Sequence, residues 1–187
     1  MSIASVEQHI IDTAKARFGN RLKAVESLPA DWDEDTFRRI LRLAPGLFVV
    51  FGGGPRDTTV DDGLVINARW GLMAVTAHAS GELAQRHGDS REIGAYEIIE
   101  ICTQLFHQHV VPGEDQMLCT DVQNLFSGAV EKQGASLYGA EFELRMSIAP
   151  DETGGATLDD FKTFNDKFDL APADGQAEAE DHVELPQ

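Results

Sequence analysis

The first stretch whose composition suggests chemistry is "FVVFGGGP", residues 48–55, where an apolar run ends in three glycines. A phosphate-binding loop begins in this way, with backbone N–H groups aimed at one point and a helix directly after them. Here Pro55 removes one N–H group, no Lys-Ser or Lys-Thr pair follows, and Asp57, Asp61 and Asp62 would repel an anion. We therefore interpret the glycines as a flexible connection between strands, and we expect no nucleotide or other cofactor.

Histidines supply the next candidate chemistry. His107 and His109 are two residues apart, so on a helix they point to different sides, which favours helix-end histidines over a metal site. His78 and His87 flank Ser80, but no Gly-x-Ser-x-Gly elbow is present, which favours a polar loop over a nucleophile. The sequence therefore predicts no metal site, no catalytic residue and no enzymatic activity.

Composition indicates a soluble globular domain. The chain has 187 residues, of which 42% are hydrophobic, and no stretch approaches the roughly 20 apolar residues of a membrane span. Cys102 and Cys119 lie in apolar surroundings, and the N-terminus lacks the basic start and apolar block of a signal peptide. These features predict reduced core thiols, synthesis in the cytoplasm and no membrane partner.

The charge is strongly negative and unevenly distributed. The formal net charge is −17, so the chain lacks the cationic surface that drives nucleic-acid binding. Residues 150–187 hold eleven acidic residues and two lysines, which places about half of the excess in the last fifth of the chain. We therefore divide the chain into a folded domain, 1–150, and an acidic C-terminal extension, 151–187.

The extension contains one apolar segment, residues 157–170. Phe161, Phe164 and Phe168 recur there at three- and four-residue spacings, and such side chains are costly to leave in water. We expect this segment to dock as an arm, either on its own domain or on a neighbouring subunit, while the residues after about 172 extend along the surface or stay mobile. The alternative is a wholly disordered tail that only keeps the protein soluble.

Helices are predicted by apolar residues that recur every three or four positions. The first spans residues 3–18, with Gly19 as its stop, and a second ends before Pro45. A third follows Asp89 and Glu92, which have capping-box spacing, and Pro112 closes it.

Strands are predicted by alternation and by apolar runs. Residues 138–148 alternate strictly, and residues 64–79 are apolar on both faces, which indicates a central strand with a bend or bulge at Gly71. Three further strands are predicted at 21–28, 47–51 and 118–126.

Two groups of residues on these strands have two interpretations each. Arg69 and Trp70 form either an interface patch or a core aromatic with a paired arginine, and we favour the second. Glu141, Glu143 and Arg145 form the solvated side of their strand or face a partner subunit.

The order of these segments resembles a family of Mu-like phage and prophage proteins regarded as tail terminators. The resemblance covers about residues 3–149 and is strongest at "LAPGLFVVFGGG" and at "RHGD" leading to "GAY". It implies an α+β fold, with a mainly antiparallel sheet of about four strands, helices packed on it, and here a C-terminal arm.

The resemblance also implies a function. Family members would form a homo-hexameric ring in the virion that caps the tail tube, stops its polymerisation and offers a surface for head–tail joining. The implied partners are the tail tube protein, the head–tail connector or neck protein, other copies of the chain and, if the tail is contractile, the sheath protein, while DNA passes through the lumen without specific binding. Alternatives are another ring-forming neck or tail-completion protein, or a small-ligand-binding domain that uses the 52–63 loop.

The candidate interface residues follow from these arguments. We expect the 52–63 loop to project from the sheet as a subunit or tube contact, and the aromatic segment to supply the arm. The residues are Gly52, Gly53, Gly54, Arg56, Asp61 and Asp62 in the loop, and Phe161, Phe164 and Phe168 in the arm.

Overall fold

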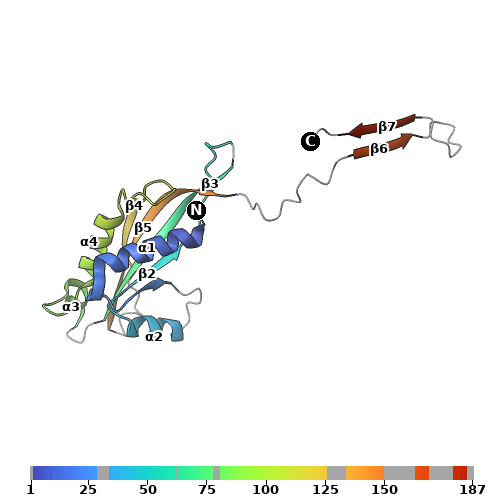
Figure 1. Cartoon of the computed structure of the whole chain (residues 1–187). Coiled ribbons are helices and arrows are strands. Elements are labelled where there is room, and N and C mark those ends of the chain that lie inside the picture. Colours follow the sequence, from blue (N-terminus) through green and yellow to red (C-terminus); the bar gives the residue numbers. More distant parts are fainter. Residues whose placement is uncertain are drawn as a thin grey trace. The chain divides into compact units, whose positions relative to one another are not determined.

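The computed structural model describes residues 2–28, 34–61, 63–77, 81–125, 134–149, 163–168 and 179–184 (Figure 1). Contacts divide the chain into two units, Met1–Ala149 and Pro150–Gln187. The elements in chain order are α1 (Ile3–Phe18), the 3-10 turn η1 (Gly19–Arg21), β1 (Ala24–Ser27), α2 (Glu34–Arg42), β2 (Gly46–Phe51), β3 (Leu64–Ala77), α3 (Glu82–His87), α4 (Ala95–Phe106), β4 (Leu118–Asn124), β5 (Ala135–Ile148), β6 (Thr163–Phe168) and β7 (Ala179–Glu184).

The first unit contains a five-stranded sheet in the order β1-β2-β3-β5-β4. All neighbouring strands are antiparallel except β1 and β2, which are parallel. The predicted α+β class is confirmed, and the long strand 64–77 is central as expected. The described sheet has five strands where about four were expected, because the short strand β1 joins its edge.

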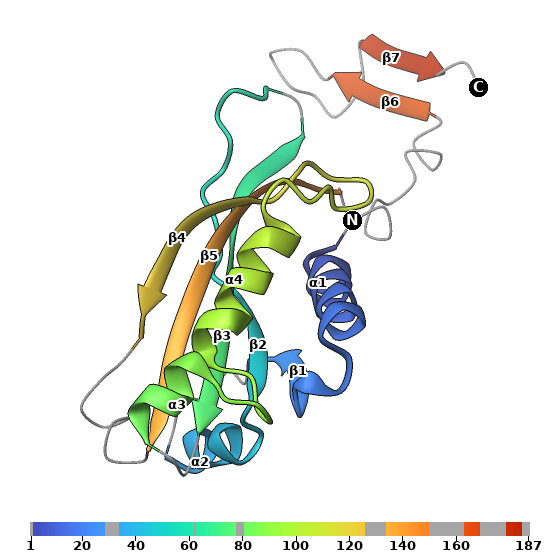
Figure 2. The same ribbon diagram turned by 90° about the vertical axis from the view of Figure 1, so that its left-hand side faces the viewer.

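Helices cover both faces of the sheet. Figure 2 shows α1 and α4 on one face, where the larger core forms from apolar residues of both helices and of the central strands, such as Ile10, Ile98, Trp70 and Phe142. On the opposite face, at one end, Ile40 of α2 belongs to a smaller core with Phe48, Val75 and Leu137. The strict alternation of β5 places its even-numbered apolar residues in the larger core, as predicted.

The ends of the helices follow local chemistry. The first helix begins with a capping box, in which the Ser5 amide donates to the Ser2 hydroxyl at 3.1 Å, and it ends at Gly19, which has a φ of 54°. The predicted cap at Asp89 is wrong. Asp89 accepts from the amides of Arg91 and Glu92 within a turn, and α4 begins later, after Gly94.

The turn before α4 explains this correction. Gly88 pairs with Ile93, which brings Gly88 against Gly94, where a Cβ on Gly94 would lie 2.2 Å from the Gly88 amide nitrogen. The chain must complete this close contact before a helix can start. Two other expectations also change: α4 ends at Phe106 rather than near Pro112, and the short helix α3 occupies part of the predicted polar loop.

No bulge is present at Gly71 in the described sheet. The pairing of β3 with both neighbours is continuous there, opposite Val50 and Glu141. A Cβ on Gly71 would lie 2.9 Å from Cγ1 of Val50, so the glycine makes room for its neighbour. The sheet irregularity lies instead on the outer strand β4, between Cys119 and Asp121.

The second unit contains a two-stranded antiparallel sheet of β6 and β7. The predicted arm residues Phe164 and Phe168 both lie on β6, and Phe161 lies outside the described residues. The sequence analysis did not predict this strand pairing.

Candidate assembly surface

The segment after β2 stays bound to the edge of β3. The Gly52 amide donates to the Arg69 carbonyl at 2.8 Å, and the Arg69 amide donates to the Gly53 carbonyl at 2.7 Å. Further along, the Asn67 amide donates to the Pro55 carbonyl and the Asp57 amide to the Val65 carbonyl. Residues 52–57 therefore extend the β2–β3 hairpin, and a strand rather than a helix follows the glycines.

The structure places a different constraint on each of the three glycines. Gly54 approaches β3 so closely that an added Cβ would lie 2.1 Å from the Asn67 carbonyl oxygen. Gly53 has a φ of 76°, a conformation that other residues rarely adopt. A Cβ on Gly52 would lie 3.4 Å from the Arg69 carbonyl oxygen, which is close to ordinary contact. Glycine is therefore required at Gly54 by a close backbone contact and at Gly53 by a positive φ.

The Asp57 carboxylate links the end of the extended β2–β3 hairpin to β5 through hydrogen bonds. Its carboxylate accepts from the Thr59 hydroxyl at 2.6 Å, from the Thr59 amide at 2.9 Å, and from Nε of Arg145 at 2.7 Å. Its side chain is only 10% exposed. These bonds, first the one from the Thr59 hydroxyl and then the one from Arg145, lower the pKa of Asp57 to about 2.

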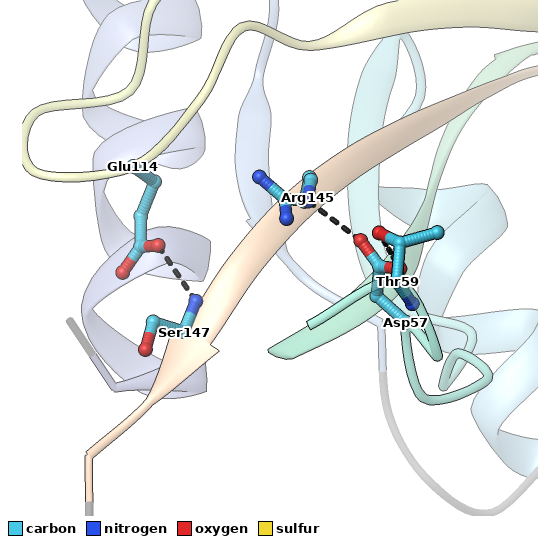
Figure 3. Close-up of polar contacts among 5 residues, drawn as sticks. All are labelled: Asp57, Thr59, Glu114, Arg145 and Ser147. Carbon is cyan, nitrogen blue, oxygen red and sulfur yellow. Dashed lines mark hydrogen bonds and ion pairs between the residues drawn. The ribbon is translucent and has the colours of Figure 1, made fainter. Parts of the chain in front are cut away.

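Two acidic side chains fix the end of β5 (Figure 3). Arg145 lies on β5 and donates to Asp57 in the 52–57 segment, which pairs with the opposite edge of β3. On the other side of β5, the Ser147 amide donates to Oε2 of Glu114 at 2.9 Å. Glu114 thereby occupies an edge that β4 does not cover, because the pairing of β4 with β5 begins at Leu118 opposite Glu143.

The described residues of the predicted loop lie at this end of the sheet. Arg56 and Asp61 are exposed, and Arg56 pairs through its backbone with Ile66. Asp62 lies outside the described residues. The arm residues belong to the other unit and are described only by their place on β6.

The favoured interpretation, a core aromatic at Trp70 and a paired arginine at Arg69, is confirmed for Trp70 only. Trp70 is fully buried in the larger core, as expected for a core aromatic. Arg69 is exposed on the opposite face of β3, and no ion pair with another described residue is formed by it. Alternation along a strand separates neighbouring residues in this way.

The histidines and cysteines have structural contacts. Nε2 of His9 lies 2.9 Å from Nε2 of His109, whose pKa is lowered by burial and then by His9. Nδ1 of His107 accepts from the Cys119 amide. Burial raises the pKa of Cys102 to about 12. Within the described ranges, no three metal-ligating side chains come together, and no helix there could cross a membrane.

Sequence reasoning missed Asp57, Glu114 and the role of Arg145. The Asp57–Thr59 spacing is typical of a local side-chain turn, so this half of the cluster had a readable signal. Arg145 lies 88 residues away and Glu114 is isolated in a loop, so neither partnership has a sequence signature.

Comparison with known proteins identifies relatives over most of the chain. The family described as Bacteriophage Mu, Gp37 matches residues 2–147. The Mu-like prophage FluMu protein gp37 of Haemophilus influenzae (strain ATCC 51907 / DSM 11121 / KW20 / Rd) is 30% identical over 188 residues, covering 98% of this chain and 91% of that protein.

Proposed function

Because the chain belongs to the family of bacteriophage Mu Gp37, we propose that it is a phage tail terminator, a structural protein of the virion rather than an enzyme. In this proposal six copies form a ring that caps the tail tube and stops its polymerisation. The same ring offers its other side to the head–tail connector. The observation that carries the proposal is the family match over residues 2–147, which spans nearly all of the first unit.

The β2–β3 tip supports a contact role for the 52–61 segment. Residues 52–57 are bound to β3 by backbone hydrogen bonds, and the one nearly buried carboxylate of the segment, among the described residues, is already used by Thr59 and Arg145. Arg56 is exposed on this bound stretch, and Asp61 is exposed just after it. A surface that is ordered before binding loses less conformational entropy on assembly. We propose that this tip contacts the tube or the adjacent subunit.

The charge of the chain supports passage of DNA through the ring. With a net charge of −17, the protein offers few cations for phosphate neutralisation. A lumen with a negative potential would repel the DNA backbone and prevent it from sticking. The same charge opposes self-association at low salt, so we expect the ring to form on the tube.

Tube growth in vitro tests the proposal. Purified tube protein is polymerised with and without this protein, and tube ends and lengths are examined by electron microscopy. We expect short tubes that end in six-fold rings. Tubes that grow to unrestricted lengths in the presence of this protein would refute the termination role. Binding to the purified connector without any binding to tubes would instead indicate a neck or tail-completion protein.

A charge reversal at the tip tests the contact surface. Arg56→Glu should slow capping and increase its dependence on salt, because a charge at the rim of an interface mainly affects the association rate. Arg42→Glu is the matched control, since Arg42 is also an exposed arginine but lies at the end of α2, before β2 begins. Equal capping by the two variants would remove the tip from the interface.

A further inference from the structure

Three histidines surround the segment that follows α4. His107 and His109 come directly after Phe106, the last residue of that helix, and His9 lies on α1. Nε2 of His9 is 2.9 Å from Nε2 of His109, and Nδ1 of His107 accepts from the Cys119 amide at 3.2 Å. One histidine therefore ties the segment to α1, and the other ties it to the start of β4.

The rings of His9 and His109 face each other nitrogen to nitrogen. Their centroids are 5.2 Å apart, which exceeds the separation of the two Nε2 atoms by 2.3 Å. This difference is about the distance from a ring centroid to its nitrogen, taken once for each ring, so the rings lie edge to edge. A hydrogen bond with this geometry holds one proton between the two nitrogens.

These contacts assign the tautomers of the neutral rings. His107 carries its proton on Nε2, because its Nδ1 is an acceptor. In the facing pair, one ring donates from Nε2, and the other accepts at Nε2 and carries its proton on Nδ1. Protonated His107 has no acceptor left for the Cys119 amide. The facing pair tolerates one charged ring but not two, because two charged rings would turn two N–H groups toward each other.

The backbone between His107 and His109 has an uncommon conformation. Gln108 has a φ of 63°, and no other residue except glycine has a positive φ in the part of the chain that the structure describes. Its amide donates to the Met117 carbonyl at 2.7 Å, and the Met117 amide donates to the His109 carbonyl at 2.8 Å. Such a conformation persists only where the surrounding contacts hold it. The histidine side chains on either side of Gln108 supply two of these contacts.

Charged groups on the surrounding elements do not favour protonation of the pair. The acidic side chains of α1, of the 107–117 loop and of β4 accept from other groups: Glu7 from Ser27, Asp12 from Gln8, Glu114 from the Ser147 amide, Asp115 from the Gln116 amide and Asp121 from Gln123. Glu100 of α4 and Glu143 of β5 are exposed. Burial and then His9 lower the pKa of His109, so the closed segment resists a proton that an open segment accepts below a pH of about 6.5.

We propose that residues 107–110 act as an acid-sensitive switch. The switch is closed while His107 is neutral and at most one ring of the His9–His109 pair is charged. It opens when both contacts are protonated, and Gln108 then leaves its positive φ. The switch is a property of the fold and does not depend on the proposed function.

The rearrangement is local because the rest of the loop is anchored. Val111 and Met117 are fully buried in the larger core, so they hold the loop on the sheet while residues 107–110 move. The same loop carries Glu114, which accepts from the Ser147 amide at the end of β5. The switch therefore lies next to the candidate assembly surface.

Hydrogen exchange of the full chain, followed by NMR, measures the opening. Each proton that the closed switch excludes should raise the open population by up to about 30-fold between pH 7.5 and pH 5, at the ordinary histidine pKa of about 6.5. The amides of Gln108, Met117 and Cys119 should lose protection accordingly, after correction for the intrinsic effect of pH on exchange. The control is the Lys23 amide, which donates to the Pro45 carbonyl at the opposite edge of the sheet. Unchanged protection at the three amides would refute the switch, and an equal loss at Lys23 would show global unfolding instead.

Two substitutions remove the two sites of protonation. In His9→Gln the side-chain oxygen can accept from protonated His109, and in His107→Asn the side-chain oxygen replaces Nδ1 as the acceptor. The double variant should match the wild-type protein at pH 7.5 but lose the increase in exchange toward pH 5. His87→Gln is the matched control, because His87 is an exposed histidine on α3 that contacts Tyr96, and it should keep the increase. A double variant that keeps the increase would overturn the proposal.

Nitrogen NMR of the wild-type histidine rings tests the same contacts without a substitution, and it decides the proposal if the double variant does not fold. At pH 7.5 we expect the Nε2–H tautomer for His107 and one tautomer of each kind in the His9–His109 pair. The Nδ1–H tautomer at His107, or the same tautomer in both facing rings, would overturn the proposal.

Discussion

Replacing Gly54 by alanine should detach the 52–57 segment from β3. The added Cβ would lie 2.1 Å from the Asn67 carbonyl oxygen and 2.8 Å from Cα of Ala68, both of which are backbone atoms that cannot rotate away. Ordinary contacts begin near 3.4 Å. The backbone must therefore move by more than 1 Å, by the difference between these distances. A shift of that size breaks the two flanking hydrogen bonds.

The expected cost follows from those bonds. The Arg69 amide donates to the Gly53 carbonyl at 2.7 Å, and the Asn67 amide donates to the Pro55 carbonyl at 2.9 Å. Each such bond contributes about 0.5–1.5 kcal/mol net, so Gly54→Ala should lower the free energy of unfolding by about 1–3 kcal/mol. For a domain of this size the melting temperature should fall by roughly 2–12 °C.

The neighbouring glycines provide matched controls. Gly52→Ala should be nearly neutral, because its Cβ would meet only a contact of 3.4 Å. Gly53→Ala should cost about 1 kcal/mol from its positive φ, and Gly53→Asn should cost less, since asparagine tolerates this conformation better. Thermal unfolding followed by circular dichroism measures all four variants. In Gly54→Ala, the amides of Asn67 and Arg69 should also exchange with solvent faster than in the wild-type protein.

Two results would refute this reasoning. If Gly54→Ala melts with Gly52→Ala, the close approach of residue 54 to β3 does not exist in solution. If Gly54→Ala is destabilised but the Asn67 amide exchanges at the wild-type rate, the cost arises elsewhere.

Three further predictions concern polar contacts in the first unit. Asp57→Asn should lower the melting temperature at pH 7, because a carboxyl pKa that is lowered in the folded state stabilises the fold at higher pH. This difference from the wild-type protein should vanish as the pH falls from 3.8 to about 2. A difference that stays constant over this pH range would contradict the prediction. The free energy of unfolding should fall as the pH drops below about 6.5, because burial and His9 disfavour protonation of His109 in the folded state but not in the unfolded chain. In urea unfolding, His109→Asn should depend less on pH than the wild-type protein. Gln85→Met should lower the free energy of unfolding in urea by about 1–3 kcal/mol, because Gln85 is 4% exposed and donates to the Gly134 carbonyl at 2.6 Å. Gln104→Met, at an exposed glutamine, is the control. Equal stability of the two variants would refute the prediction.

The fold was predictable where periodicity is strong. Residues 138–148 alternate over the whole stretch, and both their strand and its apolar face are confirmed. The helix at 3–18 is confirmed with its stop at Gly19. The cap at Asp89 was wrong because its spacing also fits a turn, and the close packing of Gly88 against Gly94 decides between them. That contact depends on tertiary structure and leaves no periodic signal.

The candidate surface was only partly predictable. The glycine run correctly indicated a connection between strands, since β3 follows it. The three glycines suggested flexibility, but in the structure Gly54 allows the backbone to lie against β3 and Gly53 adopts a positive φ. Glycine permits both outcomes, and sequence alone does not distinguish a mobile loop from a close backbone contact. The partnership of Asp57 with Arg145 depends on strand order, which places β3 between them.

Hydrogen bonds from Arg145 and Ser147 hold the loops at the end of β5 in place, and this order bears on assembly. Beyond Glu143 the strand β5 is no longer covered by β4, and two loops support it through Glu114 on one side and Asp57 on the other. Both carboxylates accept directed hydrogen bonds, so the loops are held in one arrangement relative to β5. A contact surface built on these loops is therefore ordered before any partner binds. Neutralising Glu114, which lies outside the proposed 52–61 contact segment, should therefore weaken assembly without changing a residue of that segment.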